Sequence, residues 1–212
     1  MKECCLTIRS TGPYTACRHL ARHFILGQIP PRCSGPVSSN VRPQKIRAAV
    51  AMTFDADQCK AYWDEFAQLL DMNDPRRDKR PDAFAFGGGG ELADKLLALV
   101  ISGTKRATAS LPVEYTSTNE PLPVAGDLSI ILDAKGSPRA IIERTSVEVI
   151  PFQAVDSAFA ASEGEGDGSL HYWRKAHAWY FNTVCERLGG SLEPTSEVLC
   201  QRFNLIWPPS RE

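Results

Sequence analysis

The chain has 212 residues, with 24 Lys or Arg and 25 Asp or Glu, so its net charge is close to zero. No apolar run approaches the roughly 20 residues that a helix needs to cross a bilayer, so a helical membrane protein is not expected. The seven cysteines form no C-x-x-C pair, which argues against a zinc site and against a disulfide framework. The expected location is therefore the reducing cytoplasm.

Residues 1–51 differ in composition from the rest of the chain. They hold eight basic residues and one acid, a net charge of +7, whereas residues 52–212 hold 16 basic and 24 acidic residues, a net charge of −8. The basic segment is a disordered tail, an organellar targeting leader, or an extension upstream of a true start at Met52. The folded domain is expected within residues 52–212, and its acidic charge disfavours generic nucleic-acid binding.

Two helices are predicted in the first half of this domain. Large apolar residues recur at a spacing of three to four over residues 57–72, which predicts the first helix. Residues 73–82 form a charged loop, either solvated or in contact with phosphate, whose basic residues are Arg76, Arg77, Lys79 and Arg80. Residues 87–90 are all glycine and form either an anion-binding turn or a hinge. They precede a predicted helix over residues 91–102, which Gly103 terminates.

Strands are predicted in the second half. Alternating apolar residues indicate strands over 127–133 and 139–150, and the second strand is expected to hold Glu143 on one face with Ile141 and Val147. A short helix over 153–162 and a long helix over 169–188 flank an acidic, glycine-rich loop. A strand over 197–207 is expected to close the domain.

Several residues in this order resemble a known family. The stretch Leu92–Leu111 contains Gly103-x-Lys105-x-Ala107-Thr108-Ala109-Ser110. It is followed by Gly126-Asp127, the strand with Glu143, Pro151-Phe152, Glu163-Gly164-Glu165-Gly166, Tyr172-Trp173, His177 and Phe203. Together they resemble the ASCH domain (activating-signal-cointegrator homology). The resemblance implies an α+β domain with a PUA-like fold, a small β-barrel flanked by helices, and an association with RNA. The broad family motif is G-x-K-x-x-E-x-R, and here Thr108 and Ser110 replace its Glu and Arg.

The resemblance also implies three catalytic residues. One small member of the family is an amidohydrolase of N(4)-acetylcytidine, whose Lys-x-x-Thr matches Lys105 and Thr108 and whose Ala-x-x-Glu matches Glu163. In such a site Thr108 is the nucleophile, Lys105 is the base if burial lowers its pKa, and Glu163 orients the lysine or carries the proton. The alternative interpretation is a surface lysine, a strand-forming threonine and a solvated acidic turn.

Four further residues are candidate contacts for a substrate: Gly103, Ser110, Glu143 and Trp173. Gly103 allows the chain to turn so that Lys105 and Thr108 converge on one pocket. Trp173 could stack on a nucleobase, although a position in the core of helix 169–188 explains it equally well.

These residues predict a protein that binds a nucleobase, nucleoside or RNA in a cleft lined by Lys105, Thr108 and Glu163. Hydrolysis of the amide of an N(4)-acylated cytidine is its candidate reaction. The alternatives are a non-catalytic RNA-binding module that uses residues 76–80 or the basic leader, a metal-independent ribonuclease with Lys105 on phosphate, and a fold without activity. No metal, organic cofactor, membrane or protein partner is expected.

Overall fold

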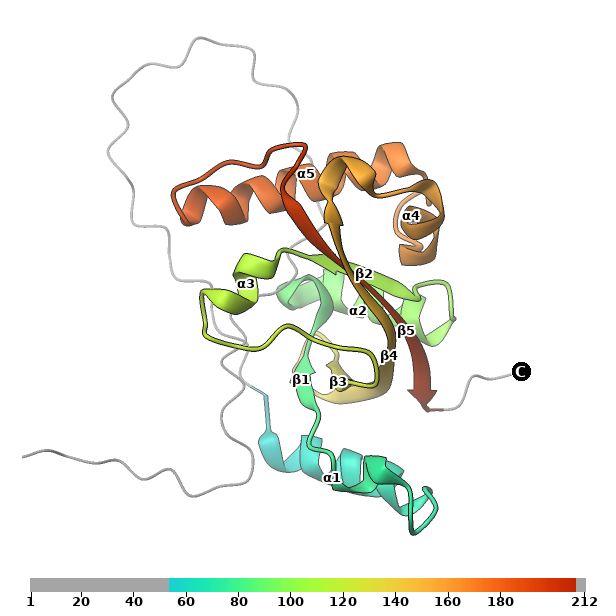
Figure 1. The fold of residues 1–212 in the computed structure, drawn as a ribbon. Coiled ribbons are helices and arrows are strands. Elements are labelled where there is room, and N and C mark those ends of the chain that lie inside the picture. Colours follow the sequence, from blue (N-terminus) through green and yellow to red (C-terminus); the bar gives the residue numbers. More distant parts are fainter. Residues whose placement is uncertain (1–53, 209–212) are drawn as a thin grey trace, which may run out of the picture.

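The computed structural model describes residues 54–208, so the expectations for residues 1–51 lie outside the described residues (Figure 1). Its centre is a five-stranded sheet in the order β1-β3-β4-β5-β2. The strands are β1 (Asp82–Phe84), β2 (Ala107–Ser110), β3 (Leu128–Leu132), β4 (Pro138–Pro151) and β5 (Glu197–Trp207). β1 runs parallel to β3, and the other neighbouring pairs are antiparallel. The α+β class is confirmed, but the sheet does not close into the expected barrel, because β1 and β2 remain its two edges.

Within the described residues, five α-helices surround the sheet. They are α1 (Ala56–Gln68), α2 (Gly90–Ile101), α3 (Pro112–Thr116), α4 (Ser157–Glu163) and α5 (Leu170–Arg187). Three begin at a side chain that accepts a hydrogen bond from the first turn: Asp55 for α1, Asp156 for α4 and Ser169 for α5. Such caps satisfy backbone N–H groups that the helix itself leaves unpaired. No helix in the described part of the chain is long and apolar enough to span a membrane.

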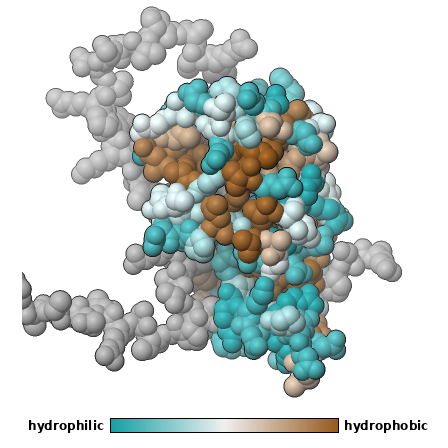
Figure 2. All heavy atoms as spheres, viewed as in Figure 1, coloured by the Kyte–Doolittle hydropathy of each residue, from teal (hydrophilic) through white to brown (hydrophobic). Residues whose placement is uncertain are grey.

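In residues 54–208 the hydrophobic core is divided among three clusters, and helices from different parts of Figure 1 pack on them. α4 and α5 pack on β2 and one end of β5 through residues such as Trp173, Phe181 and Val198. α1 packs on β1, β3 and β4 near the other end of the sheet. α2 covers a third cluster that includes Phe86 and Phe203. Figure 2 shows that hydrophilic residues cover the lower part of this face, around α1, whereas hydrophobic residues gather above it.

The register of β4 corrects one prediction. Its pairing with β5 is shifted between Ile141 and Ile142 and again between Arg144 and Ser146, as in β-bulges. The side chains of β4 therefore do not alternate strictly between the two faces of the sheet. Ile141 and Ile142 are both buried, Arg144 is buried, and Glu143 is half-exposed. The expectation that Glu143 lies among apolar neighbours is wrong, because its carboxylate lies 3.7 Å from the Arg76 guanidinium at the surface.

Candidate functional site

A buried ion cluster surrounds Lys105. The Lys105 Nζ atom donates to Glu163 Oε2 at 2.9 Å and to Glu165 Oε1 at 2.6 Å, and it lies 5.3 Å from the centroid of the Phe86 ring. Lys105 is 2% exposed and Glu163 1% exposed. Glu165 is 8% exposed, and its second oxygen, Oε2, is buried with no hydrogen-bond partner among the described residues. The predicted meeting of Lys105 with Glu163 therefore occurs inside the protein, and Glu165 joins it.

The opposing charges hold this cluster ionised. Burial alone would lower the pKa of Lys105, but the neighbouring carboxylates of Glu163 and Glu165 outweigh it and raise that pKa above its ordinary value. Burial alone would raise the pKa of Glu163, but Lys105 and His177 hold it well below its usual range. The condition set for Lys105 to act as a base, a pKa lowered by burial, is therefore not met, and the raised pKa favours its cationic form.

Two helix ends bring these side chains together. Gly103 ends α2 with φ at +75°, and the Lys105 N–H then donates to Leu99 O at 2.9 Å. The Arg106 N–H donates to Ser162 O at 2.7 Å, which ties this turn to α4. Gly164 ends α4 in the left-handed conformation, with φ at +65°. A Cβ there would lie 2.7 Å from Thr104 O, so a glycine is needed for the two helix ends to approach.

Trp173 and His177 hold Glu163 from the side of α5. The Trp173 Nε1 atom donates to Glu163 Oε1 at 2.8 Å, and the His177 Nε2 atom lies 3.3 Å from the same oxygen. The two rings stack with centroids 4.0 Å apart. Trp173 is 3% exposed, so it lies in the core and contacts the cluster rather than the solvent.

β2 holds Thr108 and Ser110, which are both buried. Ala107 and Ala109 belong to the cluster under α4 and α5, so Thr108 and Ser110 lie on the opposite face of the strand. The Ser110 hydroxyl lies 3.5 Å from the Tyr115 hydroxyl and accepts from Gln201 Nε2 at 3.2 Å. β2 thus separates Ser110 from the side of the strand where α4 and α5 pack.

Ser110 belongs to a second buried network, which crosses the sheet. The Gln201 Nε2 atom also donates to the Tyr115 hydroxyl at 3.3 Å, and Gln201 Oε1 accepts from Arg144 Nε at 2.8 Å. The Arg144 Nη1 atom donates to Ser129 Oγ at 2.8 Å, and Ser129 Oγ donates to Asp82 Oδ1 at 2.5 Å. Each of the strands β1 to β5 contributes one residue to this network, and α3 contributes Tyr115. Its end at Asp82 and Arg144 reaches an open cleft.

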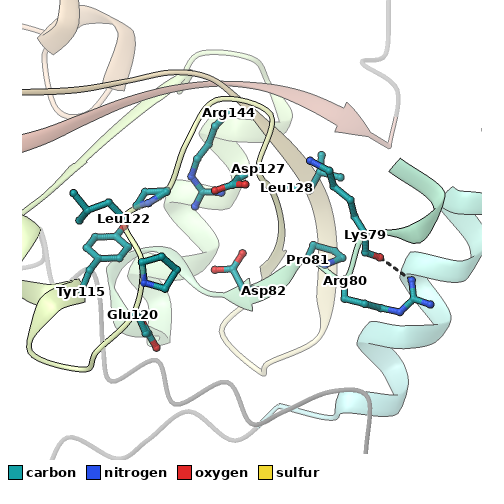
Figure 3. A pocket seen from close by; sticks show the side chains of 12 residues that line it. Lys79, Arg80, Pro81, Asp82, Tyr115, Glu120, Leu122, Asp127, Leu128 and Arg144 are labelled. Atoms are coloured by element: carbon teal, nitrogen blue, oxygen red, sulfur yellow. Dashed lines mark hydrogen bonds between the residues drawn. The ribbon is translucent and has the colours of Figure 1, made fainter. Parts of the chain in front are cut away.

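The cleft has a volume of about 430 Å³ and lies between the loop before β1 and the segment after α3 (Figure 3). Its lining comprises the basic Lys79, Arg80 and Arg144, the acidic Asp82, Glu120 and Asp127, and Pro81, Tyr115, Pro121, Leu122, Pro123 and Leu128. Lys79 Nζ donates to Gly126 O at 2.6 Å, and this bond connects the loop before β1 to the segment after α3. This volume falls within the range of small-molecule sites, roughly 300–1,000 Å³.

The predicted site residues therefore fall in different places. Lys105, Glu163 and Trp173 meet in the ion cluster, and Gly103 shapes the turn beside it. Ser110 joins the network behind the cleft, and Glu143 lies at the surface. None of the predicted catalytic or substrate-contacting residues lines the cleft itself, but Lys79 and Arg80 from the predicted basic loop do. Within residues 54–208, no three His, Cys, Asp or Glu side chains are placed to hold a metal ion.

Sequence reasoning missed Arg144, Gln201 and Asp82. A signal for Arg144 was present, because this arginine lies only two residues after the apolar run that ends at Ile142, and a buried arginine requires hydrogen-bond partners. Gln201 likewise interrupts the apolar residues of β5. The bulges in β4 concealed which face each side chain occupies.

Comparisons with known proteins identify the fold. A crystal structure of an ASCH domain from Lactobacillus crispatus JV V101 is 29% identical, with a TM-score of 0.66, and the match covers 70% of this chain and 94% of that one. The crystal structure of protein EF3133 from Enterococcus faecalis V583 is 35% identical, with a TM-score of 0.62, covering 71% and 88%. No curated protein gives a significant match. The family model of the ASCH domain matches residues 82–207, and the chain belongs to the ASCH domain family.

Proposed function

We propose that this protein binds RNA and takes one nucleobase into the cleft beside Tyr115 and Arg144. The observation that carries the proposal is the cleft itself, a concave space of about 430 Å³ with one aromatic wall and convergent polar groups. Pockets of this kind are the usual sites for small polar heterocycles. ASCH domains have a PUA-like fold and are generally RNA-binding, which supports nucleic acid as the source of the base. Fold alone does not define function, so the argument rests on the lining of the cleft.

The charges in the cleft favour a base over a phosphate. Three basic residues in the lining are matched by three acidic ones. A phosphate would gain from the basic groups but would be repelled by the carboxylates. An uncharged base presents hydrogen-bond donors and acceptors along its edge and can use both kinds of group. The balanced lining therefore fits a base that has left its stack, as in other proteins that accept a splayed nucleotide.

The loop before β1 offers a path for the flanking phosphates. Lys79 and Arg80 lie at the rim of the cleft, and their hydrogen-bond partners are the backbone carbonyls of Gly126, Lys79 and Arg77. A carbonyl leaves the positive charge of its donor intact, so both side chains remain available to phosphate. Arg76, in contrast, is neutralised by Asp74 at 2.6 Å. Of the four basic residues in this loop, Lys79 and Arg80 are therefore the proposed contacts for phosphate.

Filling the cleft tests the proposal. Leu122 lines the cleft and is 37% exposed, whereas Val113 lies outside the lining and is 36% exposed. Leu122→Trp should weaken binding of the full chain to a fluorescent single-stranded RNA by about tenfold or more, because the indole occupies space meant for a base. Val113→Trp, the matched control, should bind as the wild type does. Equal affinities of the two variants would contradict the proposal.

A second candidate function is hydrolysis of the amide of an N(4)-acylated cytidine at Lys105, Thr108 and Glu163. The contact between Lys105 and Glu163 at 2.9 Å favours it. Because the pKa of Lys105 is raised, the lysine would stabilise developing negative charge as a cation rather than accept a proton. Chromatography of N(4)-acetylcytidine incubated with the protein tests this role. Turnover abolished by Thr108→Val would support it, and absence of turnover in the wild type would remove it.

A further inference from the structure

Arg144 is held more firmly than an ordinary surface arginine. Its Nε and Nη1 atoms donate at 2.8 Å to Gln201 Oε1 and Ser129 Oγ, respectively, and the side chain is 7% exposed. The third nitrogen, Nη2, has no hydrogen-bond partner among residues 54–208, and it is not among their buried unpartnered atoms. Since Arg144 lines the cleft, Nη2 remains open to it. The two bonds fix the plane of the guanidinium, so the N–H groups of Nη2 face the cleft in a fixed direction.

Gln201 sets that direction. Its side-chain oxygen accepts from Arg144, while its nitrogen donates to Ser110 Oγ at 3.2 Å and to the Tyr115 hydroxyl at 3.3 Å. Gln201 is 1% exposed, so these contacts are shielded from water. Gln201 thus holds both Arg144, a polar group of the cleft, and Tyr115, its aromatic wall. A fully connected buried network of this kind restricts its members to one arrangement.

Resting on the proposed function, we infer that Arg144 makes the cleft selective for nucleobases that carry an exocyclic carbonyl oxygen, and that Gln201 is the residue that positions it. Uracil, cytosine and guanine each carry such an oxygen, whereas the exocyclic group of adenine is an amino donor and its acceptors are ring nitrogens. Arginine commonly donates to the O6 and N7 atoms of guanine, whereas adenine is more often read by asparagine or glutamine. A site built around a fixed donor rejects a ligand without the matching acceptor, because the donor is then left unpaired.

The test compares base preference among variants of the full chain. Labelled oligonucleotides of uridine, cytidine and adenosine of equal length are titrated by fluorescence anisotropy. The wild type should bind the uridine and cytidine oligomers about tenfold more tightly than the adenosine oligomer, in line with one good base contact. Arg144→Met should remove this preference. Arg139→Met, on the same strand but 56% exposed in its side chain, should retain it. The basic leader cannot produce such a preference, because phosphate contacts carry no base information.

Two substitutions at Gln201 separate positioning from simple support of the fold. Gln201→Glu retains an acceptor for Arg144 and should keep the base preference, while Gln201→Met removes the acceptor and should lose it. If thermal unfolding shows that Gln201→Met does not fold, the variant Arg144→Lys is tested instead. That variant keeps the charge but not the anchored fork, and it should bind RNA without preference.

The outcomes separate this inference from the proposed function. Failure of the wild type to bind any oligomer would overturn both. Binding that Leu122→Trp blocks but that shows no base preference would overturn the inference alone. If Gln201→Glu and Gln201→Met lose the base preference equally, the positioning role of Gln201 is contradicted. If Gln201→Glu keeps the preference and Gln201→Met loses it, the positioning role is supported.

Discussion

The Lys105 ammonium and the Glu163 carboxylate, 58 residues apart in the chain, form a salt bridge of 2.9 Å with side chains that are 1% and 2% exposed. This pair joins the end of α2 to the end of α4, and Glu165 and Trp173 complete it. A buried pair contributes little when compared with apolar residues of the same shape, but removal of one partner is costly. The cluster therefore governs stability whatever its chemical role.

Lys105→Met should strongly destabilise the fold. The substitution leaves two buried carboxylates without their cation, and loss of one partner of a buried pair costs about 3–5 kcal/mol. Urea unfolding at pH 7 measures the change. Lys60→Met is the control, because Lys60 pairs with Asp64 at the surface with both side chains about half exposed, and such pairs contribute about 0–1 kcal/mol. Similar losses in the two variants would contradict the account.

The same variant should reverse the pH dependence of stability. In the wild type the pKa of Glu163 is lowered by Lys105, so the unfolded state binds more protons and stability falls as the pH drops below about 5. Without the cation, burial raises the native pKa of Glu163, so the native state binds a proton before the unfolded state does. Lys105→Met should therefore become more stable between pH 7 and pH 5. Parallel curves for the two proteins would show that the ionisation of Glu163 is not coupled to Lys105.

Gly164→Ala should destabilise the protein more than Gly168→Ala. Both glycines have positive φ, +65° and +71°, and alanine there costs roughly 1–2 kcal/mol. A Cβ at Gly164 would also lie 2.7 Å from the backbone oxygen of Thr104, whereas one at Gly168 meets nothing within 4 Å. The extra loss, measured by thermal unfolding, reports the close approach of the two helix ends. Equal losses would mean that the approach is not required.

Lys79 and Arg80 should carry the salt dependence of RNA binding in the cleft. Each phosphate contact contributes about 0.7 to the slope of log K against log salt for a single strand. Lys79→Ala with Arg80→Ala should lower that slope by about 1.4 and reduce affinity uniformly across base types. Arg77, which donates to Leu70 O at 2.7 Å, provides a control in the same loop. A slope that changes as much in Arg77→Ala would indicate diffuse rather than local contact.

Cys200 should resist thiol reagents in the folded protein. Burial raises its pKa to about 12, so at pH 8 the thiolate fraction is about a thousandfold lower than that of a free cysteine. Cys185 is less buried and should react sooner. Site-resolved mass spectrometry after timed alkylation checks the order. Rapid labelling of Cys200 under native conditions would mean that β5 opens readily.

Long periodic elements were predictable from the sequence. The apolar stripe of α2 and the long α5 were identified within one or two residues, and β4 and β5 were also found. α1 ends four residues earlier than its apolar pattern suggested, at Gln68 rather than 72. β1, β2 and α3 were not predicted, because segments of three to five residues carry too little periodicity to stand out.

The candidate site was predictable only in part. The resemblance to the family brought Lys105 and Glu163 together before their contact was known, since no local pattern links residues so far apart. Glu143 was misplaced and Arg144 was overlooked for one reason, because two register shifts in β4 change which side chains share a face. Gln201 acquires its meaning from partners on α3, β2 and β4, and such contacts exist only in the folded sheet.

Photo-crosslinking tests the central claim most directly. The full chain is irradiated with a short RNA that contains 4-thiouridine, and the crosslinked peptides are identified by mass spectrometry. The account predicts crosslinks on the cleft lining, at Tyr115 or in residues 120–128, and their loss in Leu122→Trp but not in Val113→Trp. Crosslinks confined to residues outside the cleft, and unchanged in Leu122→Trp, would contradict it.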